Sequence, residues 1–334
     1  MRQVLVTGAS GMIGLRVVER LAERGVSVRA LVRERTDTRS LRAYGVEIVQ
    51  LLSGGAVPLA AFQAVDAVIH AAGALSTGAA FSRGDRAARR LYQAVNVELT
   101  EQLLTGARAA GARRFVFLSS CAVYATPTSA GLIDEDAPLG PESDYGVSKV
   151  AAERRVAAAQ AAGLSTTIVR PCIVSGPGDR HFAPAAAALA RLPLLPLPDS
   201  GGRIDLAHVD DVADLVVLCL QAPAADGRIY NATSDCPVAL KDIIDGLARR
   251  LGLRAHVVPA SARTLTRLRP LLLPILRILA PRTAPLLGSI ALRYLIHDAA
   301  FDLRRARTEL GFRPQWSAEG VLDALVAATR AQHQ

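Results

Sequence analysis

A tyrosine and a lysine in the middle of the chain have the spacing of a proton-transfer pair. Tyr145 and Lys149 stand four residues apart at the start of an alanine-rich stretch that predicts a helix, so their side chains share one helix face. An ammonium beside a phenol favours the phenolate and lowers the pKa of the tyrosine from about 10 toward working pH. The pair therefore predicts that Tyr145 acts as a general acid or base and that Lys149 tunes it.

A serine hydroxyl is expected close to this pair. Ser120 follows an apolar run, residues 114–119, that has the composition of a buried strand. Open α/β sheets bind their ligands at the carboxyl ends of strands. There the Ser120 hydroxyl would hydrogen-bond to a substrate oxygen that gains charge as hydride moves. A Tyr-x-x-x-Lys pattern is common by chance, but its order with Ser120 and with an N-terminal glycine loop gives it weight.

The glycine loop near the N-terminus has the spacing of a dinucleotide-binding site. It follows the apolar run 3–7 and leads into an amphipathic stretch. Gly8 permits the tight turn, Gly11 lets the backbone approach a pyrophosphate, and Gly14 lets the helix pack on the strand. Amides at the N-terminus of that helix would hold the phosphates. The predicted cofactor-binding residues of the loop are Thr7, Gly8, Ser10, Gly11, Met12, Ile13 and Gly14.

The end of the second apolar run indicates which dinucleotide binds. NAD sites usually carry an Asp or Glu there, about 20 residues after the glycine loop, which accepts from the ribose 2′-hydroxyl. Here Val32 and Arg33 replace the acid, and Arg35 and Thr36 follow. A guanidinium fork suits a 2′-phosphate, so NADP is favoured over NAD, with Arg33, Arg35 and Thr36 as its contacts. The alternative for Arg33 is an ordinary solvated charge.

Short apolar runs that alternate with longer amphipathic stretches must position these residues. The runs are residues 3–7, 27–32, 47–51, 67–70, 114–119 and 166–170, and the helices between them end near Gly25, Gly111 and Gly163. Runs without polar alternation suit strands that are buried on both faces. The pattern predicts an α/β fold with a doubly wound parallel sheet, a Rossmann fold, over residues 1–171, with 204–232 returning to it. Residues 172–203 and 233–334, where the alternation fails, are expected to form a smaller, mostly C-terminal substrate lobe.

Length, charge and cysteine use narrow the function classes. The chain has 334 residues of which 51% are apolar, which suits one large or two interleaved domains and excludes a disordered chain. The formal charge is +9, but the arginines are dispersed and only 4% of residues are aromatic, so nucleic acid is not an expected partner. Cys121, Cys172, Cys219 and Cys236 contain no CxxC, so neither a metal site nor a disulfide framework is expected.

Two segments bear on location. The start of the chain lacks the apolar stretch and cleavage site of a signal peptide, which predicts a cytoplasmic protein. The leucine-rich segment 265–296 is interrupted by prolines and arginines, so no transmembrane span is expected there. Peripheral contact of this segment with a membrane surface stays open, beside the alternative of a pocket wall.

Further motifs run from the first strand to the C-terminal region. They are residues 7–14, His70-Ala71-Ala72-Gly73, Asn96, Ser119-Ser120 with Tyr124, Tyr145 with Lys149, and residues 170–178, 208–213 and 309–314. With these motifs the chain resembles the extended short-chain dehydrogenases/reductases, grouped as the NAD-dependent epimerase/dehydratase family, which include 3β-hydroxysteroid dehydrogenase-like and dihydroflavonol reductase-like enzymes. The resemblance covers almost the whole chain.

This resemblance implies roles for individual residues. Ser120, Tyr145 and Lys149 would form the catalytic triad, and Lys149 would also hold the nicotinamide ribose. Further implied cofactor contacts are Ala71, Ala72, Gly73, Asn96, Ser119, Pro171 and Ile173, although an Asn96 that only caps local backbone is equally consistent with the pattern. The candidate substrate contacts are Tyr124, Cys121, His181 and Arg203. Resembling proteins often dimerise through the helix that bears the tyrosine, so a homodimer is expected.

Three reactions share this machinery: net reduction of a ketone or oxidation of an alcohol, epimerisation of a sugar nucleotide, and dehydration of a sugar nucleotide. Dehydratases of this kind place Asp-Glu after the triad hydroxyl, but Cys121 and Ala122 follow Ser120 here, which disfavours dehydration. Sugar-nucleotide members often carry an Asn within 170–176 and an Arg four residues before His208; this chain has no Asn there and has Ile204, with Arg203 one residue off.

Leucine- and proline-rich stretches at 192–198 and 268–292 fit the walls of a pocket for an apolar ketone, or else a core or dimer surface. The sequence thus favours an NAD(P)-dependent oxidoreductase that interconverts a ketone and a secondary alcohol on a mainly apolar small molecule. The alternative is a sugar-nucleotide epimerase with retained NAD(P). A non-catalytic, cofactor-binding scaffold is less favoured because the triad is intact.

Overall fold

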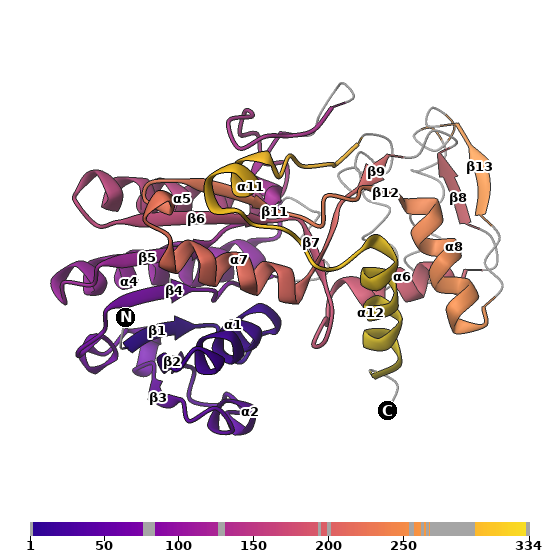
Figure 1. Ribbon diagram of the computed structural model, residues 1–334. Helices are drawn as coiled ribbons and strands as arrows, with labels where there is room; N and C mark the ends of the chain where they lie inside the picture. The colour runs from indigo at the N-terminus through magenta and orange to yellow at the C-terminus, as the bar shows by residue number, and fades with distance from the viewer. Residues whose placement is uncertain are drawn as a thin grey trace.

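A seven-stranded parallel sheet forms the centre of the molecule (Figure 1). The computed structural model describes residues 3–75, 84–125, 131–192, 195–198, 202–253, 257–261, 264, 267 and 298–331. The strand order is β11-β6-β5-β4-β1-β2-β3, so the chain winds outward in both directions from β1. The strands are β1 (Gln3–Thr7), β2 (Ser27–Val32), β3 (Glu47–Gln50), β4 (Ala67–His70), β5 (Arg114–Leu118), β6 (Thr166–Pro171) and β11 (Ile229–Ala232). The predicted doubly wound Rossmann fold is confirmed.

Helices cover both faces of the sheet (Figure 1). On one face α1 (Met12–Glu23) and α7 (Val209–Gln221) pack side by side. On the other face α4 (Leu99–Ala109) and α5 (Asp144–Ala161) do the same. The inner strands are covered on both sides and are largely apolar, as is typical of a parallel sheet, whereas β3 at the edge is partly exposed.

The two faces of β1 show how the sequence divides between these layers. Val4 and Val6 belong to the apolar core beneath α1 and α7, whereas Leu5 belongs to the core beneath α4 and α5. All three side chains are fully buried. Successive side chains of a strand point to opposite faces, so one short apolar run fills both cores.

A third apolar core lies beyond the carboxyl ends of the strands. It is formed by α6 (Phe182–Ala190), α8 (Leu240–Leu251), α12 (Ala318–Ala331) and β8 (Leu195–Pro198), which gather at the right of Figure 1. Leu195 and Leu197 are only 1% and 3% exposed within this core. The leucines of the stretch 192–198 that the structure describes therefore fill the interior, which was the alternative to a pocket wall. The stretch 268–292 lies outside the described residues.

The remaining elements are short. The strands β7 (Ile173–Ser175) and β10 (Leu206–His208) pair with each other, as do β9 (Arg203–Ile204) with β12 (Val238–Ala239) and β8 with β13 (Val257–Ala260). The helices are α2 (Arg39–Arg42), α3 (Arg86–Tyr92) and α11 (Arg304–Leu310); α3 continues through a π-helical turn, Gln93–Glu98, into α4. Short 3₁₀ turns span Ser53–Gly55, Leu59–Phe62, Cys121–Val123 and Pro223–Ala225. Within the described ranges, no helix combines the length and apolarity that crossing a membrane requires.

The six predicted strands are confirmed to within one residue at each end. Gly25, Gly111 and Gly163 follow helix ends with φ of +67°, +69° and +93°, as expected of glycines that terminate helices. The strand β11 was not among the predicted strands. Its four residues, with Asn231 among them, are too few and too polar to stand out, and the strand is defined by its pairing with β6.

Candidate active site

The glycine loop packs tightly between α1 and the segment that follows β4. Gly8 has φ of +69°, and a Cβ atom on it would lie 2.6 Å from the Ala72 backbone nitrogen. A Cβ atom on Gly14 would lie 2.1 Å from the Gly8 carbonyl oxygen. Glycine at these two positions is therefore required by the close approach of three backbone segments.

The N-terminus of α1 presents its first amides without a competing side chain. Gly11 is the N-cap and makes no side-chain cap, and the first turn contains no acidic residue. The unpaired amides and the positive end of the helix dipole favour an anion at this position. The loop and helix thus fit the pyrophosphate of a dinucleotide, as predicted from the spacing of the glycines.

The strand β2 itself ends without an acid, although the exposed Glu34 stands between Arg33 and Arg35 just beyond it. Val32 is buried, and the next residue, Arg33, is exposed, as is Arg35. The Thr36 amide donates to the Arg33 carbonyl oxygen at 3.0 Å, which turns the chain sharply after the strand. Both guanidinium groups thus lie in solvent beside the edge at which β1 and β2 end.

The segment after β4 is held from two sides. The Ala72 amide donates to the Thr7 hydroxyl at 3.2 Å, and the Ala74 amide donates to Asn96 Oδ1 at 2.7 Å. Asn96 Nδ2 donates to the Ala74 carbonyl at 3.3 Å and to Ser148 Oγ at 2.9 Å. Asn96 therefore binds local backbone and the helix α5, which was the alternative considered for this residue.

The chain brings Ser120, Tyr145 and Lys149 together at the carboxyl end of β5. Ser120 follows the strand, and its hydroxyl accepts the Ala122 amide at 3.1 Å and lies near enough to the Tyr145 phenol to affect its pKa. Helix α5 begins one residue before Tyr145, because Ser143 caps it by accepting the Gly146 amide at 3.0 Å. The i, i+4 spacing then places Lys149 on the same face, with Nζ 6.0 Å from the centre of the Tyr145 ring.

The electrostatics of the pair differ from the prediction. Burial raises the pKa of Tyr145 to about 12, and the nearby Ser120 side chain opposes this only in part. Burial lowers the pKa of Lys149 to about 8, against the attraction of Glu153. The expected lowering of the Tyr145 pKa is wrong for this arrangement, because Lys149 is directed to the Leu118 carbonyl oxygen, 2.8 Å away, rather than to the phenol.

A buried ion pair lies one turn further along α5. Glu153 Oε1 and Oε2 accept from Arg170 Nε and Nη2 at 2.9 and 2.7 Å. Glu153 Oε1 also accepts the Ser119 hydroxyl at 2.5 Å. Ser119, a predicted cofactor contact, therefore donates its hydroxyl proton within the protein. Sequence reasoning missed Glu153, although its place eight residues after Tyr145 puts it on the same helix face and was a usable signal.

Comparison with known proteins identifies the family. A model of the NAD dependent epimerase/dehydratase family matches residues 4–233. The chain belongs to this family. It is an extended short-chain dehydrogenase/reductase, an NAD(P)-dependent enzyme, as its motifs predicted.

Relatives of this family enzyme include reductases. The chain is 29% identical to a 2-alkyl-3-oxoalkanoate reductase of Stenotrophomonas maltophilia, over 98% of this chain and 100% of the relative. It is 30% identical to a 4-hydroxy-2-methyl-3-oxo-4-farnesyl-3,4-dihydroquinoline-1-oxide ketoreductase of Stigmatella aurantiaca, over 97% and 95% of the two chains. Among solved structures, MoeE5 in complex with UDP-glucose and NAD is 25% identical with a TM-score of 0.75, over 99% and 100% of the chains.

Two of the four candidate substrate residues of this family enzyme are buried. Tyr124 is 3% exposed, and its hydroxyl donates to Asn231 Oδ1 at 2.6 Å. Cys121 is 6% exposed, and its thiol donates to the Arg170 carbonyl oxygen at 3.2 Å. Both polar groups are thus engaged inside the protein, so the structure does not favour them as substrate contacts.

The other two candidates lie at the surface. His181 is exposed at the N-terminus of α6. Arg203 is exposed, and its guanidinium donates to the Pro237 carbonyl at 2.8 and 3.2 Å. The structure therefore does not gather the four predicted substrate residues around Tyr145.

Of the predicted cofactor residues in this region, Pro171 is buried at the end of β6, and Ile173 is half-buried at the start of β7.

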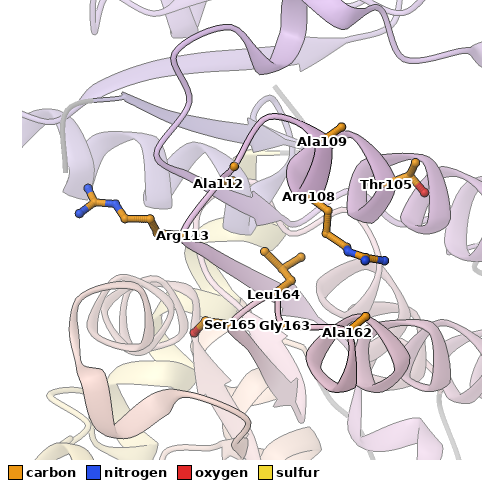
Figure 2. A pocket seen from close by; sticks show the side chains of 10 residues that line it. Thr105, Arg108, Ala109, Ala112, Arg113, Ala162, Gly163, Leu164 and Ser165 are labelled. Atoms are coloured by element: carbon orange, nitrogen blue, oxygen red, sulfur yellow. The ribbon is translucent and has the colours of Figure 1, made fainter.

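A surface cavity of about 710 Å³ lies at the opposite edge of the sheet (Figure 2). It is lined by the ends of α4 and α5 and by the segments that lead into β5 and β6, including Arg108, Arg113 and Leu164. The triad follows the carboxyl end of β5, whereas this cavity precedes its amino end. It is therefore separate from the candidate active site of the enzyme.

Proposed function

We propose that this enzyme is an NADP-dependent ketoreductase that acts on a mainly apolar ketone, with Ser120, Tyr145 and Lys149 as its catalytic residues. The observation that carries the proposal is the gathering of three side chains after β5: Ser120 lies beside Tyr145, and Lys149 is buried one turn further along α5, with Nζ 6.0 Å from the Tyr145 ring centre. The names of two full-length relatives, an oxoalkanoate reductase and a ketoreductase, support the direction of the reaction.

A nicotinamide held by the glycine loop and by the residues after β4 would supply the hydride for the carbonyl carbon. Tyr145 donates its phenolic proton to the carbonyl oxygen, and a pKa of about 12 keeps the phenol protonated at neutral pH until that moment. The Ser120 hydroxyl hydrogen-bonds to the same oxygen as negative charge develops on it. The Lys149 ammonium, held by the Leu118 carbonyl with Nζ 6.0 Å from the Tyr145 ring centre, attracts the phenolate across this distance, and solvent then restores the proton.

An apolar substrate is supported by the segment that follows β6. Cys172, Ile173 and Val174 leave the sheet beside the candidate catalytic residues and are half-buried, with apolar side chains at the latter two positions. The two reductase relatives carry names of alkyl and farnesyl compounds. We infer that residues 172–203 and 233–334 form the lobe that binds the substrate, whereas residues 1–171 with 204–232 bind the dinucleotide.

Arg33 and Arg35 support NADP as the dinucleotide. They are exposed beyond the end of β2, on either side of Glu34, and Arg33 takes the place of the acid that directly follows this strand in NAD sites, so a 2′-phosphate there would meet a cationic fork. Helix α5 and its neighbour α4, which lie along one flank of the molecule, are the proposed homodimer surface (Figure 1). Light scattering of the purified protein measures the oligomeric state, and a monomer would contradict the dimer.

A substrate panel tests the function. Aliphatic 3-oxo esters and cyclic ketones of increasing apolar size are offered with NADPH and with NADH, and dinucleotide oxidation is followed by absorbance. We expect net NADPH oxidation whose kcat/KM rises with apolar chain length. Dinucleotide oxidation that falls as the chain lengthens would contradict an apolar substrate.

The second candidate function is sugar-nucleotide epimerisation. It is supported by the match to MoeE5, solved with UDP-glucose and NAD, and by 28% identity over 74% of the chain to a UDP-glucose 4-epimerase of Vibrio cholerae. Engagement of the Arg203 guanidinium by Pro237 leaves it poorly placed for a diphosphate. An epimerase would interconvert UDP-sugars without net NADPH consumption, whereas we expect no such conversion.

A further inference from the structure

His70, the last residue of β4, is fully buried between two threonines. Its Nδ1 atom lies 2.7 Å from the Thr7 hydroxyl, at the end of β1, and its Nε2 atom lies 2.9 Å from the Thr100 hydroxyl on α4. The threonines are 93 positions apart in sequence, but the β1–β4 register, with Thr7 opposite His70, brings them to one ring. The imidazole therefore joins the glycine loop to the α3–α4 helix.

The direction of each hydrogen bond in this chain is determined. The Thr100 hydroxyl donates its only proton to the Asn96 carbonyl oxygen at 2.8 Å, so toward His70 it can only accept. His70 Nε2 therefore carries the proton, and Nδ1 accepts from the Thr7 hydroxyl. The Thr7 oxygen in turn accepts the Ala72 amide at 3.2 Å. Only the neutral Nε2–H tautomer gives a hydrogen-bond partner to both ring nitrogens of His70 and to the protons of both threonine hydroxyls.

The same chain reaches the catalytic helix. Asn96, whose carbonyl accepts from Thr100, donates its side-chain amide to Ser148 Oγ at 2.9 Å. The Ser148 hydroxyl donates to the Tyr145 carbonyl oxygen at 2.6 Å. Asn96 also makes two hydrogen bonds to the backbone of Ala74, four residues after His70. Two sets of hydrogen bonds, joined covalently through Asn96, therefore connect the glycine loop to the turn of α5 that bears Tyr145.

Residues 71–74 pack against the glycine loop on one side and against Lys149 of α5 on the other. Gly8 packs on the Ala71–Ala72 peptide so closely that a Cβ atom on it would lie 2.6 to 2.7 Å from these backbone atoms. On the other side, a Cβ atom on Gly73 would lie 3.3 Å from Lys149 Nζ. A shift of this segment by a few tenths of an ångström would move the phosphate loop or the ammonium of Lys149.

Burial, helped by a neighbouring positive charge, keeps His70 in its neutral form. Burial lowers the pKa of His70 to about 3, and the nearby Lys149 ammonium lowers it further. A protonated imidazole would also lose the acceptor that the Thr7 hydroxyl needs. The tautomer is therefore fixed across the working pH range.

We propose that His70 is a positioning residue for dinucleotide binding and for the catalytic helix, because its fixed neutral tautomer locks residues 71–74 against the glycine loop on one side and against α5 on the other. The part of the proposal that concerns Tyr145 rests on the proposed function. The part that concerns the glycine loop rests only on the binding of a dinucleotide, which is a property of the family.

Dinucleotide affinity in the absence of substrate tests this proposal. His70→Gln keeps an acceptor and a donor about as far apart as the two ring nitrogens, whereas His70→Leu has neither. We expect the NADPH dissociation constant, measured by nucleotide fluorescence on folded protein, to stay within about twofold for His70→Gln and to rise about tenfold for His70→Leu. Equal affinity of the Leu variant and the natural protein would overturn the proposal.

Threonine variants keep the test informative if His70→Leu does not fold. Thr100→Val interrupts the chain away from the glycine loop, and Thr329→Val is its control, because Thr329 is equally buried and donates to the carbonyl four residues back in α12. We expect Thr100→Val to weaken NADPH binding about threefold, and Thr7→Val combined with it to do less than the product of the single effects. An unchanged dissociation constant for Thr100→Val, or strict additivity, would contradict the proposal.

Nuclear magnetic resonance of ¹⁵N-labelled imidazole provides a readout on the natural protein. The proposal requires His70 to give the Nε2–H pattern and not to titrate between pH 5 and 9. An Nδ1–H pattern or titration in that range would overturn it. If the protein bound NADPH but reduced no ketone, the proposed function would fail while these three measurements would stand.

Discussion

The two flanks of the candidate catalytic helix are held by different chemistry. Toward β1 and β4, α5 is joined to the dinucleotide loop by neutral hydrogen bonds through Ser148, Asn96 and His70. Toward β6, it is joined by a charged pair, Glu153 with Arg170, whose side chains are 6% and 2% exposed. Neutral bonds set direction with little electrostatic field, whereas a buried charge both holds position and changes the pKa of its neighbours.

The charged flank extends toward the third apolar core, to which Tyr124 belongs. The Arg170 guanidinium lies 4.8 Å from the centre of the Tyr124 ring and donates to the Glu135 carbonyl at 3.1 Å. Tyr124 in turn bonds to Asn231 on β11. This flank therefore ties the catalytic helix to segments that lie far along the chain, and the difference between the flanks separates positioning of the dinucleotide from tuning of the catalytic groups.

The largest effect, a loss of kcat, is expected from a change at Tyr145, which lies on α5 between the two flanks. Tyr145→Phe removes the proton donor but keeps the ring against Tyr92, whose centroid is 5.9 Å away. We expect kcat for ketone reduction to fall about 10²- to 10⁴-fold, with the NADPH dissociation constant unchanged. Tyr230→Phe, in a buried tyrosine of β11, is the control and should keep its activity. Full turnover by Tyr145→Phe would refute the proton-transfer role.

Loss of the buried charge should lower stability. Glu153→Gln leaves the Arg170 guanidinium buried without its carboxylate, which we expect to reduce the free energy of unfolding by about 3 to 5 kcal/mol in urea denaturation. Glu101→Gln breaks a pair with Arg155 whose side chains are 49% and 52% exposed, and it should cost less than about 1 kcal/mol. Similar losses in both variants would remove the distinction between the flanks.

The buried lysine makes stability depend on pH. Its folded pKa of about 8 lies below the unfolded value of 10.5, so the unfolded chain holds more protons between these values. The cost of burying the charge is full below pH 8 and is lost as pH rises toward 10.5. Relative to Lys149→Met, the natural protein should therefore gain up to about 3 kcal/mol of unfolding free energy over this window. Parallel curves for the two proteins would contradict the lowered pKa.

The smallest effect concerns the phosphate end of the dinucleotide. Arg33→Ala should raise KM for NADPH about tenfold and leave KM for NADH nearly unchanged, because only the 2′-phosphate is lost as a partner. Arg42→Ala, an exposed arginine beyond the same strand, serves as the control. Equal changes in both KM values would remove Arg33 from the 2′-phosphate site.

The sequence predicted what depends on neighbours along the chain. The glycine loop and the six apolar runs are local patterns, and the i, i+4 spacing of Tyr145 and Lys149 fixed their common face. Partners distant in sequence were not predictable. The Leu118 carbonyl that takes the Lys149 ammonium is 31 residues away, and the His70 hydrogen bond to Thr7 spans 63 residues. The predicted pKa of Tyr145 failed for this reason.

The substrate side was predicted least well. Tyr124 and Cys121 follow Ser120 closely in sequence, which made them candidates for substrate contacts, but both are buried against Arg170 and Asn231. Arg170 and Asn231 lie on neighbouring strands, and only the pairing of β11 with β6 brings them to this place. The residues around Arg170 and Asn231 therefore form no motif of fixed spacing in the sequence. The dinucleotide-binding residues do, because the glycines of the loop recur at fixed intervals.

Hydride transfer from labelled dinucleotide tests the central claim most directly. The protein is incubated with NADPH deuterated at C4 on the transferred face and an aliphatic 3-oxo ester, and the product is analysed by mass spectrometry and proton resonance. We expect one deuterium on the carbinol carbon and one NADPH oxidised for each alcohol formed. Alcohol without deuterium, or dinucleotide that stays reduced while a UDP-sugar is epimerised, would contradict the account.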